Sequence, residues 1–400
     1  MAGHPREKSA RLLVLGAGPA QLGLLEAARA RGVWTAVADR DPAAPGFRLA
    51  DRRCIVSTED EPAIERLAAA LDLDGIIAPG TDWPVAVAAR VAEKLALPHP
   101  VLPATAVLAT NKLRQREALD AAGVPQPRWQ AVTDAAEVEL ELPLVVKAPD
   151  RQGQKGLSLV RTRDELPAAV AAARAASRNG VAVVEELVDG PEVTVIGFST
   201  GGPFSALAVT DRLTAEPPAF GVALAHVYPA AVADGNACAL AAEHAVKALQ
   251  ITHGPSYTQV RMSTHSAQVM EVAARLGGGH DAELVEAATG VPLNDLAISG
   301  ALGEDVSVPP VERLVGGAVT RFLVAPPGRL GSVDVPEGLE GVVRVRIYRQ
   351  AGYLFTPLRR GADRAGAVLA VGASREEALA RANAAADRIR FITADAGALV

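Results

Sequence analysis

Leu144-Val-Val-Lys147, followed five residues later by Gln152-Gly-Gln-Lys-Gly156, is the stretch that decides the fold of this chain. The apolar run predicts a buried strand, and the glycine-spaced segment predicts a hairpin turn with exposed backbone N–H groups. Lys147 carries three donors on a flexible stem that can reach phosphate oxygens, and Lys155 adds charge to the turn. A strand-end lysine reaching water and an ordinary β-turn would explain each feature separately. Their adjacency favours one common cause, a site that closes over a triphosphate.

Acidic residues follow the next predicted strand, at residues 181–184. Glu185-Glu-Leu-Val188 comes directly after it and precedes Asp189-Gly-Pro-Glu192. We expect backbone groups of residues 185–188 to meet an adenine edge, while Glu192 accepts hydrogen bonds from ribose hydroxyls. Solvated acids beside a turn are the alternative interpretation.

A third cluster lies further along the chain. Glu271 stands within the strand-like segment Gln268-Val-Met-Glu-Val272, and Arg275 and the triple glycine Gly277 to Gly279 follow it. A strand acid, an arginine and a flexible turn within a few residues can assemble magnesium, phosphate and a substrate carboxylate.

The first hundred residues alternate strand and helix patterns, which predicts a parallel α/β sheet. The strand Arg11-Leu-Leu-Val-Leu15 leads into Gly16-Ala-Gly18, and Asp39 follows the second strand, which is part of the dinucleotide-binding fingerprint. The third glycine is missing because Gln21 stands in its place. A tight strand-to-helix turn without cofactor is therefore the competing interpretation of this segment.

The composition of the 400 residues bounds the possible functions. This length predicts two or three domains. The net charge of -6 and the aromatic content of 4% offer neither the field nor the stacking surfaces that nucleic acid needs, so we expect no nucleic-acid partner. No apolar run approaches the roughly 18 residues of a membrane span, so we expect no membrane association. Cys54 and Cys238 form no zinc or disulfide pattern, which fits the cytoplasm.

Taken in order, these segments resemble the ATP-grasp superfamily, specifically its carboxylate–amine ligases related to bacterial L-amino acid ligases. The resemblance covers nearly all of the chain. It rests on an ordered set: Gly80-Thr-Asp82, Asn111-Lys112, Pro143 to Lys147, Gly153 to Gly156, Glu185-Glu186, Gly190-Pro-Glu192, Gly254-Pro-Ser256 and Glu271 to Gly279.

The resemblance implies an α/β and α+β multidomain chain with the ATP-grasp fold. Residues 1–103 would form an N-terminal Rossmann-like parallel α/β domain that carries no NAD. Residues 104–300 would form the ATP-grasp domain, with a small lid subdomain at about 128–188. Residues 301–400 would form a C-terminal α+β portion that completes the ATP-grasp region.

The resemblance also assigns roles to matching residues. It implies an ATP site in which Lys112 and Lys147 bind the phosphates and a mobile phosphate loop is formed by Gln152, Gly153, Lys155 and Gly156. The hinge that contacts adenine would be Glu185, Glu186, Leu187 and Val188, and the acid that binds ribose would be Glu192. Glu271 resembles a magnesium ligand, and Gln259 could add one amide oxygen. Arg275 resembles the arginine that stabilises the acyl phosphate or its attack by the amine. His280, just past the glycines, is a candidate general base or substrate contact, although such a histidine is more often structural.

Two positions depart from the family pattern. Many members carry glutamate at the position of Gln259 and asparagine at the position of Ala273. Ala273 can offer no metal ligand, so the number of magnesium ions stays open. Asp281 or Glu283 could compensate, but an acid at a helix N-terminus explains both equally well.

The implied activity is ATP-dependent amide or peptide bond formation through an acyl phosphate, without a covalent enzyme intermediate. The cofactors would be ATP and Mg²⁺, with Mn²⁺ as an alternative, and the substrates a small-molecule carboxylate and an amine. The proteins that this chain resembles are usually homodimers. Two alternatives stay open: an ATP-grasp-like protein with reduced or lost turnover, and a nicotinamide-dependent oxidoreductase resting on Gly16, Gly18 and Asp39. The motifs do not identify the acid and the amine.

Overall fold

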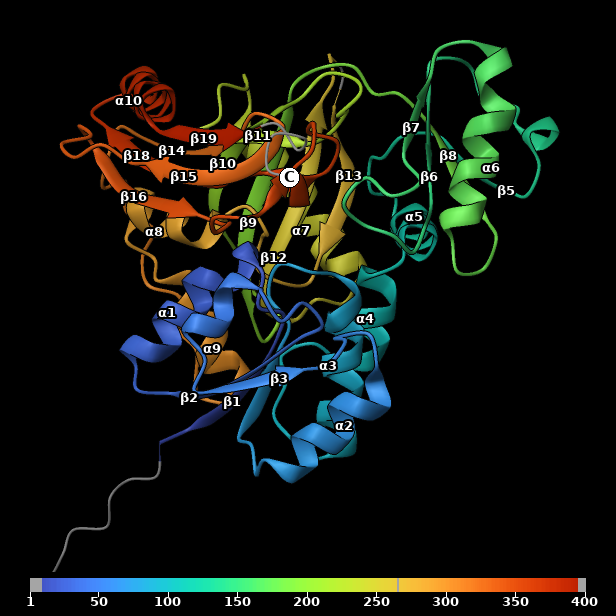
Figure 1. The fold of residues 1–400 in the computed structure, drawn as a ribbon. Coiled ribbons are helices and arrows are strands. Elements are labelled where there is room, and N and C mark those ends of the chain that lie inside the picture. Colours follow the sequence, from blue (N-terminus) through green and yellow to red (C-terminus); the bar gives the residue numbers. More distant parts are fainter. Residues whose placement is uncertain (1–8, 265, 395–400) are drawn as a thin grey trace, which may run out of the picture.

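The N-terminal unit is a four-stranded parallel sheet with helices on both sides (Figure 1). The computed structural model describes residues 9–264 and 266–394. The strand order is β3-β2-β1-β4, and the central strands have no polar face because helices cover both sides. The elements are β1 (Arg11–Leu15), β2 (Trp34–Asp39), β3 (Arg52–Ile55), β4 (Gly75–Ile77), α1 (Leu22–Ala30), α2 (Glu61–Ala70) and α3 (Trp83–Lys94). The predicted parallel α/β sheet is confirmed.

A short helical segment joins this unit to the rest of the chain. It comprises α4 (Pro103–Ala109) and α5 (Lys112–Ala121). Asn111 caps α5 by accepting hydrogen bonds from the N–H groups of Leu113 at 3.0 Å and Arg114 at 3.3 Å. Gly123, at φ 66°, follows its end, as the glycine pattern predicts. This cap fixes the position of Lys112 in the first turn of the helix.

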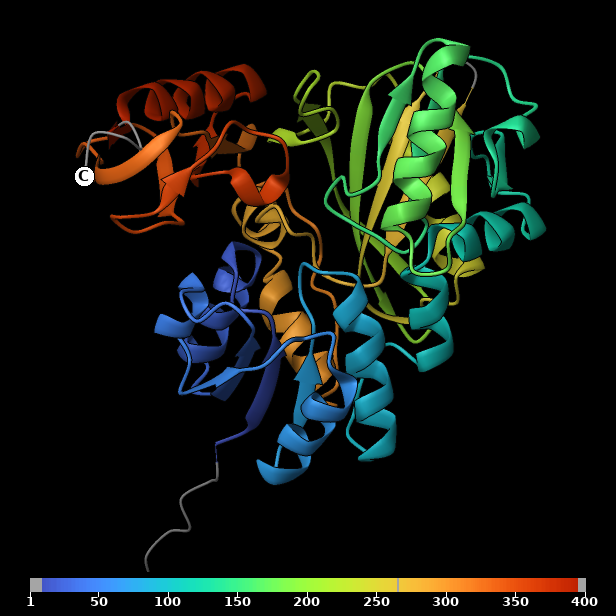
Figure 2. The same ribbon diagram turned by 45° about the vertical axis from the view of Figure 1, so that its right-hand side comes forward.

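The lid is a small antiparallel sheet with its own core (Figure 2). Its strands run in the order β5-β8-β6-β7, and α6 packs across them. The elements are β5 (Trp129–Val132), β6 (Leu144–Lys147), β7 (Ser158–Val160), α6 (Leu166–Ala176) and β8 (Ala182–Glu186). β8 extends two residues beyond the strand that the sequence predicts, so Glu185 and Glu186 belong to the strand and not to a turn after it.

The largest sheet has eight strands in the order β13-β12-β9-β10-β11-β14-β18-β16. Residues after 301 therefore extend the same sheet that begins with β9. A separate three-stranded sheet, β17-β15-β19, lies at its C-terminal end. The strands are β9 (Glu192–Thr200), β10 (Phe204–Thr214), β11 (Ala223–Tyr228), β12 (His253–Met262), β13 (Ala267–Ala273), β14 (Gly317–Leu323), β15 (Gly328–Asp334), β16 (Val342–Ile347), β17 (Leu354–Phe355), β18 (Gly366–Gly372) and β19 (Arg390–Ala394).

Four helices pack against these sheets, and they are α7 (Gly235–Ala248), α8 (Asp281–Thr289), α9 (Leu293–Ala301) and α10 (Arg375–Arg388). α9 lies against α1 and β4, so the large sheet is fastened to the N-terminal unit. α1 lies beneath β16 in Figure 1. None of the helices in the described part of the chain is long and apolar enough to cross a membrane.

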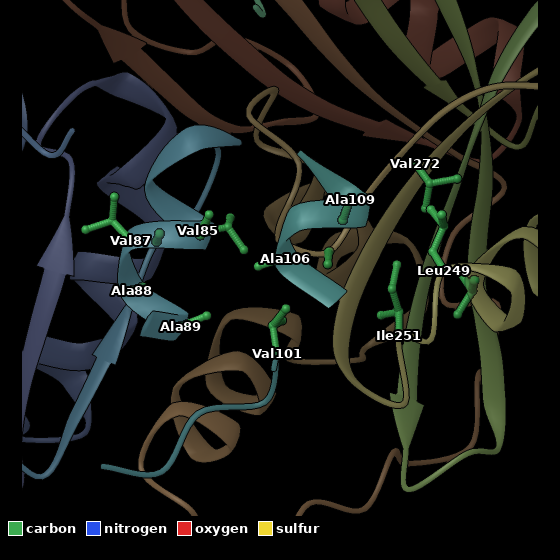
Figure 3. Close-up of a cluster of buried hydrophobic side chains, with 14 of the residues drawn as sticks. Val85, Val87, Ala88, Ala89, Val101, Ala106, Ala109, Leu249, Ile251 and Val272 are labelled. Atoms are coloured by element: carbon green, nitrogen blue, oxygen red, sulfur yellow. The ribbon is translucent and has the colours of Figure 1, made fainter. Parts of the chain in front are cut away.

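One hydrophobic core joins the N-terminal unit to the large sheet (Figure 3). Val87 of α3, Ala106 of α4, Leu249 after α7 and Val272 of β13 are all fully buried in it. Burial of each large aliphatic side chain contributes about 1.5–3 kcal/mol. This packing holds α5 against β13, which brings Lys112 and Glu271 together.

Candidate active site

A cavity opens between the lid, α5 and the large sheet, and we call it the central cavity. Of the fifteen residues that the sequence assigns to the site, thirteen line it. These are Lys112, Lys147, Gln152, Gly153, Lys155, Glu185, Glu186, Leu187, Val188, Glu192, Gln259, Glu271 and Arg275. Gly156 and His280 do not belong to its lining. Residues spread over 164 positions of the sequence thus meet in one place.

Lys147 is held at the cavity wall by a buried ion pair. Its Nζ lies 2.6 Å from Oε2 of Glu185, and the Nε of Arg116 lies 2.9 Å from Oε1 of the same carboxylate. Burial opposes ionisation of Glu185, but Arg116 and Lys147 outweigh it and hold its pKa at about 2. The carboxylate therefore stays charged and fixes the ammonium group of Lys147 beside the cavity.

Arg116 joins three elements of the site. It is 2% exposed, and besides Glu185 it donates to the carbonyl oxygens of Val269 at 2.9 Å and Met270 at 2.7 Å. It lies on α5 four residues after Lys112 and thus contacts β8 of the lid and β13 of the large sheet. No sequence motif marked Arg116, because its partners lie far away in the chain.

Lys112 contacts β13 and Arg151, the residue before the 152–156 loop. Its Nζ is 3.0 Å from Oε1 of Glu271 and donates to the carbonyl oxygen of Arg151 at 2.8 Å. Burial disfavours the ammonium, but Glu271 and Asp82 raise the pKa of Lys112 above its ordinary value. Lys112 is therefore a fixed cation at the floor of the cavity.

Glu192 is bound by two arginines that the sequence did not single out. Its carboxylate lies 2.6 Å from Nη1 of Arg212 and 3.1 Å from Nη2 of Arg261. Burial opposes this charge, yet the two guanidinium groups lower the pKa of Glu192. The predicted ribose acceptor is thus an anion already positioned by its neighbours, with lone pairs left for further hydrogen bonds.

Arg275 and the 152–156 loop both reach the start of α3. Nη2 of Arg275 lies 2.6 Å from Oδ1 of Asp82, and the backbone N–H of Asp82 donates to Oε1 of Gln152 at 2.7 Å. The loop at residues 152–156 therefore lies over the cavity and touches the N-terminal unit. Gln154 adopts φ 64°, and its Nε2 donates to the carbonyl oxygen of Gly221 at 3.3 Å.

Gly156 has a packing role at the end of this loop. Its φ is 69°, and a Cβ there would come within 2.8 Å of the Cβ of Ala176. The residue therefore lets the loop pass closely over α6. The structure does not bring Gly156 to the cavity lining, in contrast to the sequence prediction.

The residues around Glu271 offer few ligands for a metal ion. Gln259 lies opposite Glu271 in the β12–β13 ladder, and Ala273 lies opposite Tyr257. The described residues contain no group of three or more His, Cys, Asp or Glu side chains arranged to hold a metal. One carboxylate and one amide oxygen fit a single Mg²⁺, because this ion is usually held by one or two carboxylates, substrate phosphates and water.

His280 lies outside the central cavity, so the structure does not support its assignment as a base there. It is 5% exposed; its Nε2 is 2.6 Å from the hydroxyl of Tyr348, and its Nδ1 is 3.2 Å from Oε1 of Glu283. Both ring nitrogens are therefore engaged. Glu283 is also bound by Arg346 at 3.1 Å, and Asp281 is paired with His226 and accepts from the N–H of Gly279, so neither acid is free to replace a ligand at Ala273.

Side chains of the N-terminal unit fill the space around the Gly16 turn. The N–H of Ala17 donates to Oδ2 of Asp39 at 2.8 Å, and Nε2 of Gln21 donates to the carbonyl oxygen of Pro79 at 2.5 Å. The Gln21 amide occupies the space above Gly16, where a Cβ would be 2.9 Å from its Cδ. Asp39, the acid of the dinucleotide-binding fingerprint, and the turn itself are therefore hydrogen-bonded within the protein. This disfavours the nicotinamide interpretation.

Two family models match the chain. The ATP-grasp domain model matches residues 140–283, and the model of L-amino acid ligase C-terminal domain 2 matches residues 321–394. The uncharacterized protein y4rH of Sinorhizobium fredii is 29% identical over 380 residues, which are 88% of this chain and 77% of that protein. D-alanine–D-alanine ligase of Marinobacter nauticus is 30% identical over 167 residues, 38% of this chain and 49% of that enzyme.

Solved structures share the whole architecture. An L-amino acid ligase from Bacillus licheniformis superposes with a TM-score of 0.81 at 23% identity, covering 97% of this chain and 100% of that one. The biotin carboxylase domain of Hydrogenobacter thermophilus 2-oxoglutarate carboxylase, solved with MgADP, gives a TM-score of 0.80 at 18% identity, over 96% and 90% of the two chains. At these identities the likeness concerns the fold.

The cavity lies within the region that the first model matches, apart from the residues that α5 and the N-terminal unit supply. The C-terminal strands β14 to β19 correspond to the second model. Residues 140–283 thus match the ATP-grasp domain family and residues 321–394 match the C-terminal domain of L-amino acid ligases, and the fold of the chain is that of the ATP-grasp ligases.

Proposed function

We propose that this protein activates an amino acid or another small carboxylic acid as an acyl phosphate and transfers the acyl group to an amine. The convergence of Lys112, Lys147, the 152–156 loop and Glu271 on one cavity carries this proposal. Phosphoryl transfer needs cations and N–H donors along the phosphates, and these segments supply them.

The reaction has two steps. A carboxylate oxygen attacks the γ-phosphorus of ATP, the bond to the ADP oxygen breaks, and ADP leaves. The amine nitrogen then attacks the acyl carbon, inorganic phosphate leaves, and the amine loses a proton. Lys112 and Lys147 stabilise the negative charge on the transferring oxygens because both ammonium groups are already held in place. Arg275, which lines the same cavity, would stabilise the anhydride and its attack by the amine.

Magnesium would be held by Glu271 with Gln259, and it would neutralise charge on the phosphate oxygens. Glu271 is paired with Lys112 at 3.0 Å. Burial opposes ionisation of Glu271, but Lys112 and Lys147 lower its pKa. The carboxylate is therefore anionic and available as a metal ligand at neutral pH.

A substrate screen tests the proposal. We expect ADP formation with Mg²⁺ and ATP only when a suitable acid and amine from a panel of amino acids and small carboxylates are present. Hydroxylamine should trap the acyl phosphate as a hydroxamate. Lys147→Met should lower kcat by about 10²- to 10³-fold, as expected for the loss of one preorganised charge donor.

The second candidate, an ATP-binding protein with reduced or lost turnover, rests on the neutral Gln259 and on Ala273, which offers no ligand. Nucleotide binding in the absence of ADP formation across the whole panel would favour it. For the Lys147→Met variant, Lys147→Arg serves as the matched control because it keeps the positive charge next to Glu185.

A further inference from the structure

A second cavity lies between the N-terminal unit and the C-terminal region, and we call it the interdomain cavity. It has a volume of about 620 Å³ and is lined by residues 41–45, Phe47, Arg48, Arg53 and residues 348–353 apart from Gly352. It shares no lining residue with the central cavity. Segments about 300 positions apart in the sequence form its two walls.

Three arginines line this cavity without a carboxylate partner. Nη2 of Arg53 donates to the carbonyl oxygen of Pro42 at 2.9 Å, and Nη2 of Arg349 donates to that of Ala362 at 3.2 Å. Nε of Arg48 contacts the carbonyl oxygen of Pro45 at 3.4 Å. Within residues 9–264 and 266–394, none of the three forms an ion pair with a carboxylate.

The Nε–H group of Arg349 lacks a hydrogen-bond partner among the described residues. This nitrogen is buried and is not accessible from the cavity, so an anion there would be bound through the terminal nitrogens of the guanidinium group.

Aromatic rings set the orientation of two guanidinium groups. Arg349 lies 4.4 Å from the ring centroid of Tyr353, and Arg53 lies 5.0 Å from that of Phe47. Stacking restricts each planar group to one orientation, which prepares its edge to bind a planar carboxylate or a phosphate. Among the described residues of the lining Asp41 is the only carboxylate, so the three arginines leave a positive charge in the cavity.

We propose that the interdomain cavity is a second binding site, separate from the nucleotide site, for a small organic anion that carries a carboxylate or phosphate group. The guanidinium groups of Arg53 and Arg349 bind the anionic group, and the exposed apolar lining residues Pro42, Ala43 and Ala351 favour a ligand with an organic part. The hydroxyl of the neighbouring Tyr348 is bound to His280, so the site lies next to the turn that carries Gly279.

Isothermal titration calorimetry tests this site without turnover. Saturating a non-hydrolysable ATP analogue first blocks the central cavity, and phenyl phosphate, malonate and inorganic phosphate then serve as probes. We expect one site per chain for phenyl phosphate or malonate, with weaker binding of inorganic phosphate. Arg349→Met should weaken binding about tenfold or more, as expected for a lost charge-assisted hydrogen bond. Arg349→Lys should retain part of the affinity.

Arg390→Met is the matched control, because Arg390 is exposed on β19 and lies outside the cavity lining. If Arg349→Met does not fold, Arg53→Met on the exposed wall replaces it. The proposal is overturned if no probe binds saturably, if the ATP analogue displaces the probe, or if the Arg349 and Arg390 variants bind alike. Equal affinity for inorganic phosphate and phenyl phosphate would overturn the organic character of the ligand. A chain without ligase activity could still pass this test, so the two proposals fail independently.

Discussion

The central and interdomain cavities both concentrate positive charge, but they differ in how that charge is held. In the central cavity Lys112, Lys147 and Arg275 each have a carboxylate within 3.0 Å. In the interdomain cavity Arg53 and Arg349 donate to carbonyl oxygens and stack on aromatic rings, and neither has a carboxylate partner among the described residues. Paired cations are preorganised and stabilise the fold, whereas unpaired ones retain their capacity to bind an added anion. We therefore expect the cations of the central cavity to stabilise the fold, and those of the interdomain cavity to contribute little to its stability.

The largest expected effect on stability concerns the buried ion pairs beside the central cavity. Arg116→Met should lower the free energy of unfolding by about 3–5 kcal/mol, because it removes one of the two cations that offset the buried charge of Glu185. Urea denaturation measures this loss. Adding Glu185→Gln should restore part of the stability. A loss below about 1 kcal/mol would show that Arg116 does not hold the three elements together.

Acid should weaken the ion pairs of Glu185 and so lower the free energy of unfolding. The pKa of Glu185 is about 2 in the folded protein and near 4.5 in an unfolded chain, so its stabilisation is fully present above pH 4.5. This stabilisation, about 3 kcal/mol at most, is lost as the pH falls from 4.5 towards 2. The difference in unfolding free energy between wild type and Glu185→Gln should therefore shrink over that range. A pH-independent difference would contradict the assigned ion pair.

A smaller effect is expected from a charge added to the central cavity. Gln259→Glu places a second carboxylate opposite Glu271, so it should lower the Mg²⁺ concentration for half-maximal ADP formation about tenfold, equivalent to about 1.4 kcal/mol. Gln259→Leu is the control that removes the amide oxygen, and it should raise that concentration. An unchanged Mg²⁺ dependence in both variants would place the metal elsewhere.

The smallest effect is expected in the interdomain cavity. Arg349→Met should lower the free energy of unfolding by no more than about 0.5 kcal/mol, because the residue has no carboxylate partner among the described residues and the substitution removes a buried N–H group that lacks an acceptor. The same denaturation experiment as for Arg116 makes the comparison direct. A loss comparable with that of Arg116→Met would mean that the two cavities do not differ in the way described here.

Much of the site could be predicted from local sequence. Lys147 and the 152–156 loop were recognisable because strand periodicity and glycine turns depend on neighbouring residues. Glu271 and Arg275 were found in the same way, on a strand end before a glycine turn. All of these except Gly156 line the central cavity.

The residues that hold the site together could not be predicted in this way. Arg116, Arg212 and Arg261 lie on ordinary helix and strand segments, and their carboxylate partners are 20 to 69 positions away. His280 illustrates the opposite case. It lies next to the glycines in sequence, but its ring nitrogens are engaged by Tyr348 and Glu283, and it is not among the residues that line the central cavity.

The amino-acid sequence alone therefore determined the order of strands and helices, the turns, and the kind of chemistry that the lysines and Glu271 can support. These properties depend on side-chain type and on contacts between neighbours along the chain. Only the tertiary structure decided which charges meet, which cations are paired and where a second cavity forms. Those outcomes depend on packing between segments far apart in the chain, and hydrophobic burial in a shared core, which specifies no individual ion pair, brings the segments together.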